Sequence, residues 1–183
     1  MPEETIVRFC SPTLAGIKTA SLFSHAYESP VCLLQELRAL NRLLARKGLC
    51  ALPLRYAGGK ALIYLFRRSR LQCDLSDPAA RALLEERGYS CESPEKCIAQ
   101  LIGRLKEYEE FPHEIGLFLG YPLEDVRGFI ENSGCNCKCV GCWKVYSDEK
   151  ACQKLFEQYR LCTEIYLRNL SEGKSIDQLT VAV

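Results

Sequence analysis

Four of the twelve cysteines in this chain of 183 residues fall within one string of eight residues. They are Cys135, Cys137, Cys139 and Cys142. If the start of the string is extended, three of the thiols point the same way, because alternate side chains of a strand share a face. The last two have the C-x-x-C spacing of a metal-binding turn, with a glycine between them. The string therefore predicts a thiolate site for zinc, iron, copper(I) or an iron–sulfur cluster.

Two lysines accompany these thiols, at Lys138 and Lys144. Positive charges favour thiolate, the form that binds metal and exchanges disulfides. A structural zinc site usually has two C-x-x-C turns, whereas this string offers one turn and a C-x-C-x-C run. The alternative interpretation is a reduced, solvent-facing loop whose thiols have no role.

Most of the other cysteines have spacings typical of core packing. Cys152 and Cys162 share an apolar helical stripe, and Cys50, Cys73 and Cys97 fall on other apolar faces. The N-terminus resembles no signal peptide, so the thiols are expected to be reduced in a cytoplasmic protein. The high cysteine count points to a low-oxygen cytoplasm.

His113 and Glu114 are the only adjacent histidine and carboxylate pair. Imidazole titrates near neutral pH, so the pair could serve as a base or as ligands. No nucleophile, phosphate-binding loop or dinucleotide fingerprint accompanies the pair. The alternative is a helix start, with Glu114 favouring the helix dipole and His113 as a cap. The sequence therefore leans against an enzyme.

Charge is distributed unevenly although the net charge is only +1. Residues 36–70 hold nine basic and one acidic side chain, and residues 71–131 hold six basic and thirteen acidic ones. The basic segment predicts either pairing with the chain's own acidic segment or a surface that docks an acidic partner. The arginines expected to form that surface are Arg38, Arg42, Arg46, Arg67 and Arg68.

Residues 114–129 have the spacing of two short helices joined at a glycine, as in a DNA-binding helix-turn-helix. Glu124 and Asp125 begin the second helix, where they would repel phosphate. A helical hairpin over about 112–131 is therefore expected, without sequence-specific DNA binding.

Helix signals recur along the chain. A capping side chain precedes a proline at Ser29-Pro30, Asp77-Pro78 and Ser93-Pro94. The third helix carries an apolar stripe that ends at Tyr108, and Ser147 is expected to cap a long final helix.

Strands are expected at Thr5–Phe9, Cys50–Tyr56, Ala61–Phe66 and Cys142–Tyr146, with extended chain over Leu71–Leu75. The hairpin would turn at residues 57–60 and present Cys50, Leu52, Leu54 and Tyr56 on one apolar face. No apolar run is long enough for a membrane span. The prediction is a single α+β domain over residues 1–183, with a small, mostly antiparallel sheet covered by five or six helices.

Four strings occur together in the chain: Cys10–Lys18, Phe111–Pro122, Asp125–Ile130 and Gly141–Tyr146. Together they resemble the bacterial family called domain of unknown function 3793, over nearly the whole chain. The resemblance brings no activity and no catalytic residues. It implies anaerobic hosts and genes near those for iron uptake and flavodoxin, which favours metal or redox physiology and a flavodoxin-like acidic partner.

Aromatic residues cluster in the same strings, among them Tyr121 and Trp143. Such residues could line a flat cofactor pocket, although aromatics at this spacing more often form a core. The leading hypothesis is a cytosolic, non-catalytic protein that handles metal, such as zinc or iron, or thiols. The second is a module that docks an acidic protein, and the third is an enzyme that uses His113 and Glu114.

Overall fold

The computed structural model describes residues 1–107 and 111–182. Helices make up 57% and strands 16% of the described residues, which confirms the predicted α+β class. The chain forms two compact units. Unit 1 contains residues 1–69 and 159–183, and unit 2 contains residues 70–158. The predicted single domain stays a prediction.

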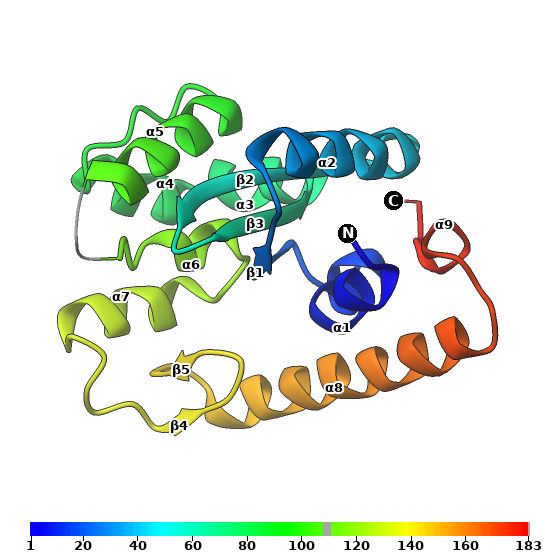
Figure 1. Cartoon of the computed structure of the whole chain (residues 1–183). Coiled ribbons are helices and arrows are strands. Elements are labelled where there is room, and N and C mark those ends of the chain that lie inside the picture. The colour runs from blue at the N-terminus through cyan, green and yellow to red at the C-terminus, as the bar shows by residue number, and fades with distance from the viewer. Residues whose placement is uncertain (108–110, 183) are drawn as a thin grey trace. The chain divides into compact units, whose positions relative to one another are not determined.

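Unit 1 is built on a three-stranded antiparallel sheet (Figure 1). The strands are β1 (Ala20–Ala26), β2 (Leu49–Ala57) and β3 (Lys60–Arg67), in the order β1-β3-β2. The predicted hairpin is confirmed as β2 and β3. Gly58 and Gly59 make its turn with φ of 55° and 72°, a region that favours glycine.

The predicted apolar face of β2 is wrong. Leu49, Ala51 and Leu54 are the buried residues, whereas Cys50 and Leu52 are half-buried. The register shifts between Pro53 and Arg55, so the alternation breaks there.

Helices pack on this sheet in unit 1. They are α1 (Glu3–Leu14) and α2 (Pro30–Leu44), with the 3-10 turn η1 (Ala45–Lys47) after α2, and α9 (Ile176–Leu179) near the C-terminus. Their buried residues form one core with the strands, and the half-buried Tyr166, Leu167 and Leu170 pack against it. These last three belong to α8 (Glu149–Ser171).

Two predicted extended segments are helices. Thr5–Phe9 lies inside α1, because Ile6, Cys10 and Leu14 recur at helical spacing and all three are buried. Likewise Leu71–Leu75 lies inside α3 (Arg68–Ser76), where two leucines four residues apart are buried.

Unit 2 consists of short helices and a small hairpin. Besides most of α3 and the first part of α8, it contains α4 (Pro78–Glu86), α5 (Pro94–Glu107), α6 (Ile115–Phe118) and α7 (Leu123–Glu131). They are followed by β4 (Cys139–Val140) paired with β5 (Lys144–Val145). The expected helical hairpin is therefore α6 and α7, and Tyr108 lies outside the described residues.

The three predicted proline-preceding caps are confirmed by hydrogen bonds. Backbone N–H groups of the first helical turns donate to the side chains of Ser29, Asp77 and Ser93. The predicted cap of α8 is wrong by one residue, because Asp148 accepts from the N–H of Ala151. No described helix combines the length and apolar character needed to cross a membrane.

Candidate functional site

A buried carboxylate, Glu114, pairs with a partly exposed arginine at the entry to α6 in unit 2. The side chain of Glu114 is 6% exposed. Its Oε1 accepts a hydrogen bond from the hydroxyl of Tyr89 at 2.9 Å and lies 3.9 Å from Nη1 of Arg104. Burial, and then the charge of Glu114, raise the pKa of Tyr89, so this hydroxyl stays a neutral donor.

The guanidinium of Arg104 is held on three sides. It donates to the carbonyl oxygen of Arg87, pairs with Glu114 and lies 4.5 Å from the ring centroid of Tyr89. Arg104 therefore positions the Glu114 carboxylate.

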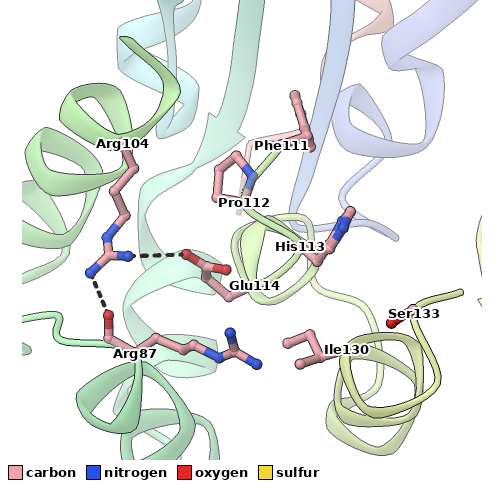
Figure 2. Close-up of a pocket in the computed structure, with 8 residues that line it drawn as sticks. All are labelled: Arg87, Arg104, Phe111, Pro112, His113, Glu114, Ile130 and Ser133. Carbon is pink, nitrogen blue, oxygen red and sulfur yellow. Dashed lines mark hydrogen bonds and ion pairs between the residues drawn. The ribbon is translucent and has the colours of Figure 1, made fainter. Parts of the chain in front are cut away.

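These groups line a hollow of about 650 Å³ (Figure 2). Its walls are Arg87, Arg104, Phe111, Pro112, His113, Glu114, Ile130 and Ser133. His113 is exposed and lies on the side away from Arg104, with its ring 4.7 Å from that of Phe129. Both members of the predicted pair thus line one hollow.

The cysteine-rich string forms the β4–β5 hairpin and its approach. Cys135 and Cys142 are exposed, and Cys137 and Cys139 are half-buried. Cys142 lies beside Tyr121, whose hydroxyl is 3.5 Å from the Cys142 carbonyl oxygen. Cys139 lies close enough to Glu149 of α8 and to Cys137 for their charges to add to the effect of burial, which raises the pKa of its thiol.

No three of these four thiols come together in the described part of the chain. Nowhere in residues 1–107 and 111–182 do three Cys, His, Asp or Glu side chains group so that they could hold a metal ion. The predicted metal site stays a prediction without support from this geometry. All twelve cysteines are free of disulfides.

The flanking lysines bond to backbone oxygens. Nζ of Lys138 donates to Ser147 O, and Nζ of Lys144 donates to Gly134 O at 2.7 Å. Partial burial, followed by the charge of Glu149, raises the pKa of Cys139. The expected lowering of thiol pKa is therefore wrong for Cys139.

Asp125 of α7 anchors this hairpin. It is 2% exposed, so it cannot face DNA as the sequence suggested. Its Oδ2 accepts from Nε1 of Trp143, and its Oδ1 accepts from the N–H groups of Tyr146 and Ser147, all at 2.7 Å. Glu124 alone keeps an exposed carboxylate at the start of α7, and the absence of sequence-specific DNA binding stays a prediction.

Trp143 lies within an aromatic stack. Its ring stacks on Tyr121 at 4.5 Å and meets Phe156 edge-on at 4.6 Å. Tyr121 and Trp143 therefore serve as packing residues here, as the core alternative proposed.

Two glycines permit close approach to the same hairpin. A Cβ on Gly128 would lie 2.5 Å from Cγ of Tyr146, and one on Gly141 would lie 2.2 Å from the ring of Phe156. A side chain at either position would therefore force Tyr146 or Phe156 to shift.

We expect Gly128→Ala to lower the free energy of unfolding by about 1–3 kcal/mol, because the new methyl overlaps the root of the Tyr146 side chain. Gly103→Ala is the matched control. Its helical position in α5 is open, so alanine should be neutral or add up to about 1 kcal/mol. Urea unfolding of both variants gives the measurement, and equal midpoints would contradict this packing.

Of the five arginines expected to form the docking surface, four are exposed and one is buried. Arg38, Arg42 and Arg46 are exposed along α2 and η1, and Arg68 is exposed at the start of α3. None of the first three guanidinium groups is within ion-pair distance of a carboxylate in the described parts of the chain.

Arg67 is a correction to the predicted docking surface. It is 1% exposed, and its guanidinium donates to the carbonyl oxygens of Thr13, Leu14 and Val181 at 2.6–2.8 Å. It therefore holds the end of α1 to the C-terminal segment and is not free to meet a partner.

Sequence reasoning missed the roles of Arg87 and Arg104. Arg104 had a signal, because it follows Leu101 by three residues on the apolar stripe of α5, where a charge needs a buried partner. Arg87 gave no such signal, because a basic residue that follows the last turn of a helix, before a glycine, is an ordinary feature of helix ends.

The family model described as "Protein of unknown function (DUF3793)" matches residues 6–180. Neither the curated proteins nor the solved structures include a significant match.

Proposed function

The chain belongs to the DUF3793 family, and we propose that it is an interaction module that docks an acidic protein on the exposed face of α2. The observation that carries this proposal is the row formed by Arg38, Arg42 and Arg46. The three residues follow one another at intervals of four, so they share one side of the helix and of the turn that continues it.

The row is available for a partner. The three guanidinium groups have no hydrogen bond or ion pair to residues 1–107 or 111–182. Lys47, which follows, is engaged instead, because its Nζ bonds to Thr180 O and pairs with Asp177 at 3.1 Å. The row therefore keeps charges that an acidic surface could neutralise.

Apolar side chains accompany the charges. Val31 and Leu34, on the first turn of α2, are 65% and 40% exposed. An interface needs apolar contacts as well as charge, because exposed ion pairs supply only about 0.2–1 kcal/mol each. The combination suits a protein partner with carboxylates around an apolar patch.

The charge of unit 1 supports the same partner class. Unit 1 holds thirteen basic and seven acidic residues, so it is positively charged. Unit 2 holds eleven basic and sixteen acidic residues, so it is negatively charged. The whole chain stays near neutral, which is unusual for a nucleic-acid binder. Metal or thiol handling is not part of this proposal, because no convergence of thiols supports it.

The test is binding of a purified flavodoxin, a strongly acidic probe, measured by calorimetry. We expect the triple variant R38E/R42E/R46E to weaken binding by about ten-fold or more, since each lost pair contributes up to about 1 kcal/mol and each new carboxylate repels. Binding by the unaltered chain should also weaken as salt is added.

The matched control reverses three exposed cations of unit 2, in R127E/K150E/K154E. It changes the net charge by the same amount and should leave binding unchanged. Equal weakening in the two variants would mean that only net charge matters, and no binding by the unaltered chain would reject a flavodoxin-like partner.

A further inference from the structure

The hollow in unit 2 has a chemistry that neither the family match nor the docking proposal uses. Its volume of about 650 Å³ lies in the range of small-molecule sites. Ionic groups meet apolar walls there, since Phe111, Pro112 and Ile130 lie opposite or beside the charged side chains.

Glu114 is fixed but retains one free oxygen. Oε1 is engaged by Tyr89 and Arg104. Oε2 has no bonding partner among the described residues, and in Figure 2 it points toward the middle of the hollow. A carboxylate that is buried and held from one side presents a preorganised acceptor to whatever enters.

Arg87 offers the complementary group. Its backbone oxygen binds Arg104, whereas its side chain extends across the hollow toward Ile130 (Figure 2). No described residue forms a hydrogen bond or ion pair with this guanidinium. A planar guanidinium binds a carboxylate through two parallel hydrogen bonds.

The charges of the walls select the ligand. Two guanidinium groups face one carboxylate, so the hollow favours a single negative charge. A phosphate dianion fits less well, because Glu114 would repel its second charge. The free Oε2 of Glu114 requires a donor, such as a hydroxyl or an ammonium group.

We propose that this hollow binds a small carboxylic acid that also carries a hydroxyl or ammonium group. The carboxylate pairs with Arg87, the hydroxyl or ammonium group donates to Glu114, and the carbon skeleton packs on Ile130. His113 lies at the rim, where its ring can contact the bound molecule. No bond is made or broken in this proposal.

The experiment titrates the full chain with lactate, glycerate, 3-hydroxybutyrate and glutamate, each of net charge −1, by calorimetry. Acetate and inorganic phosphate are included as anions without the required donor or with excess charge. At least one of the four acids should bind with a Kd of about 1 mM or below, and at least ten-fold more tightly than acetate or phosphate.

Arg87→Ala should weaken that binding by about ten-fold or more, because it removes the only guanidinium free to meet the ligand in the described part of the hollow. Arg81→Ala is the matched control, since Arg81 is also exposed on α4 but pairs with Glu85 and does not line the hollow. It should leave the Kd unchanged.

Glu114→Gln adds a second, chemically distinct variant. It keeps the shape and an acceptor but removes the negative charge, so an ammonium-bearing ligand should lose more affinity than a hydroxyl-bearing one. The proposal is overturned if none of the four acids binds, if acetate or phosphate binds equally well, or if binding survives Arg87→Ala.

Discussion

Replacing Arg67 by methionine is expected to lower the free energy of unfolding by about 3–5 kcal/mol. The variant keeps an aliphatic stem of similar length but loses every donor. The carbonyl oxygens of Thr13 and Leu14, which Arg67 satisfies, lie in fully buried residues. Each of these two oxygens also accepts one backbone N–H, from Gly16 and Val181, so the loss comes from the bonds to the charged guanidinium, which contribute about 1.5–3 kcal/mol each.

Urea unfolding measures this effect, with Arg68→Met as the matched control. Arg68 is adjacent in sequence but exposed, so its replacement should change stability by at most about 0.5 kcal/mol. Arg67 also holds Val181 O at 2.8 Å, so limited proteolysis should cut the C-terminal segment faster in the Arg67 variant alone. Equal midpoints for the two methionine variants would contradict this role of Arg67.

Replacing Asp125 by asparagine is expected to lower the free energy of unfolding by about 2–4 kcal/mol. Both carboxylate oxygens accept hydrogen bonds from donors of the β4–β5 region. An amide has only one acceptor oxygen, so its NH₂ group must face one or more of these donors. Glu124→Gln, at the exposed neighbouring position, should be nearly neutral.

Trp143 makes this variant simple to follow, because it is the only tryptophan of the chain. Its indole N–H donates to Asp125 at 2.7 Å. Loss of that bond should shift tryptophan emission to longer wavelength as the ring gains solvent. An unshifted spectrum with unchanged stability would contradict the anchoring role of Asp125.

The Asp125 carboxylate also predicts a pH dependence. Burial opposes its ionisation, but the hydrogen bonds from Tyr146, Trp143 and Ser147 outweigh burial and lower its pKa. A lowered folded-state pKa stabilises the fold above the unfolded value of about 3.9. That stabilisation is lost as pH falls through the folded-state pKa, so acid unfolding monitored at Trp143 should be less steep in Asp125→Asn.

Local chemistry explains what the sequence predicted well. The caps at Ser29, Asp77 and Ser93 depend on side chains within three residues of the bonds they make. The β2–β3 hairpin depends on two adjacent glycines. These features need no knowledge of distant residues.

The features that the sequence did not predict depend on contacts between residues far apart in the chain. Strand β1 exists because Ala20–Ala26 pairs with β3, where Ala20 lies opposite Phe66 and Ala26 lies opposite Lys60, 46 and 34 positions along the chain. Arg67 bonds to a residue 54 positions away, and Asp125 to one 22 positions away. A charge in a sequence gives no sign of such a partner, so both were assigned to the surface.

The cysteine string shows the same limit. Spacing predicted converging thiols, but within residues 1–107 and 111–182 no three of them come together so that they could hold a metal ion. Spacing alone therefore does not establish a thiolate site.

The central claim is that α2 carries the docking surface, and hydrogen–deuterium exchange tests it most directly. The full chain is measured with and without the flavodoxin probe. Slower exchange is expected over residues 30–47, with no change over α5 or over residues 135–145. Protection confined to residues 135–145, or absent from residues 30–47 when the probe is bound, would contradict the claim.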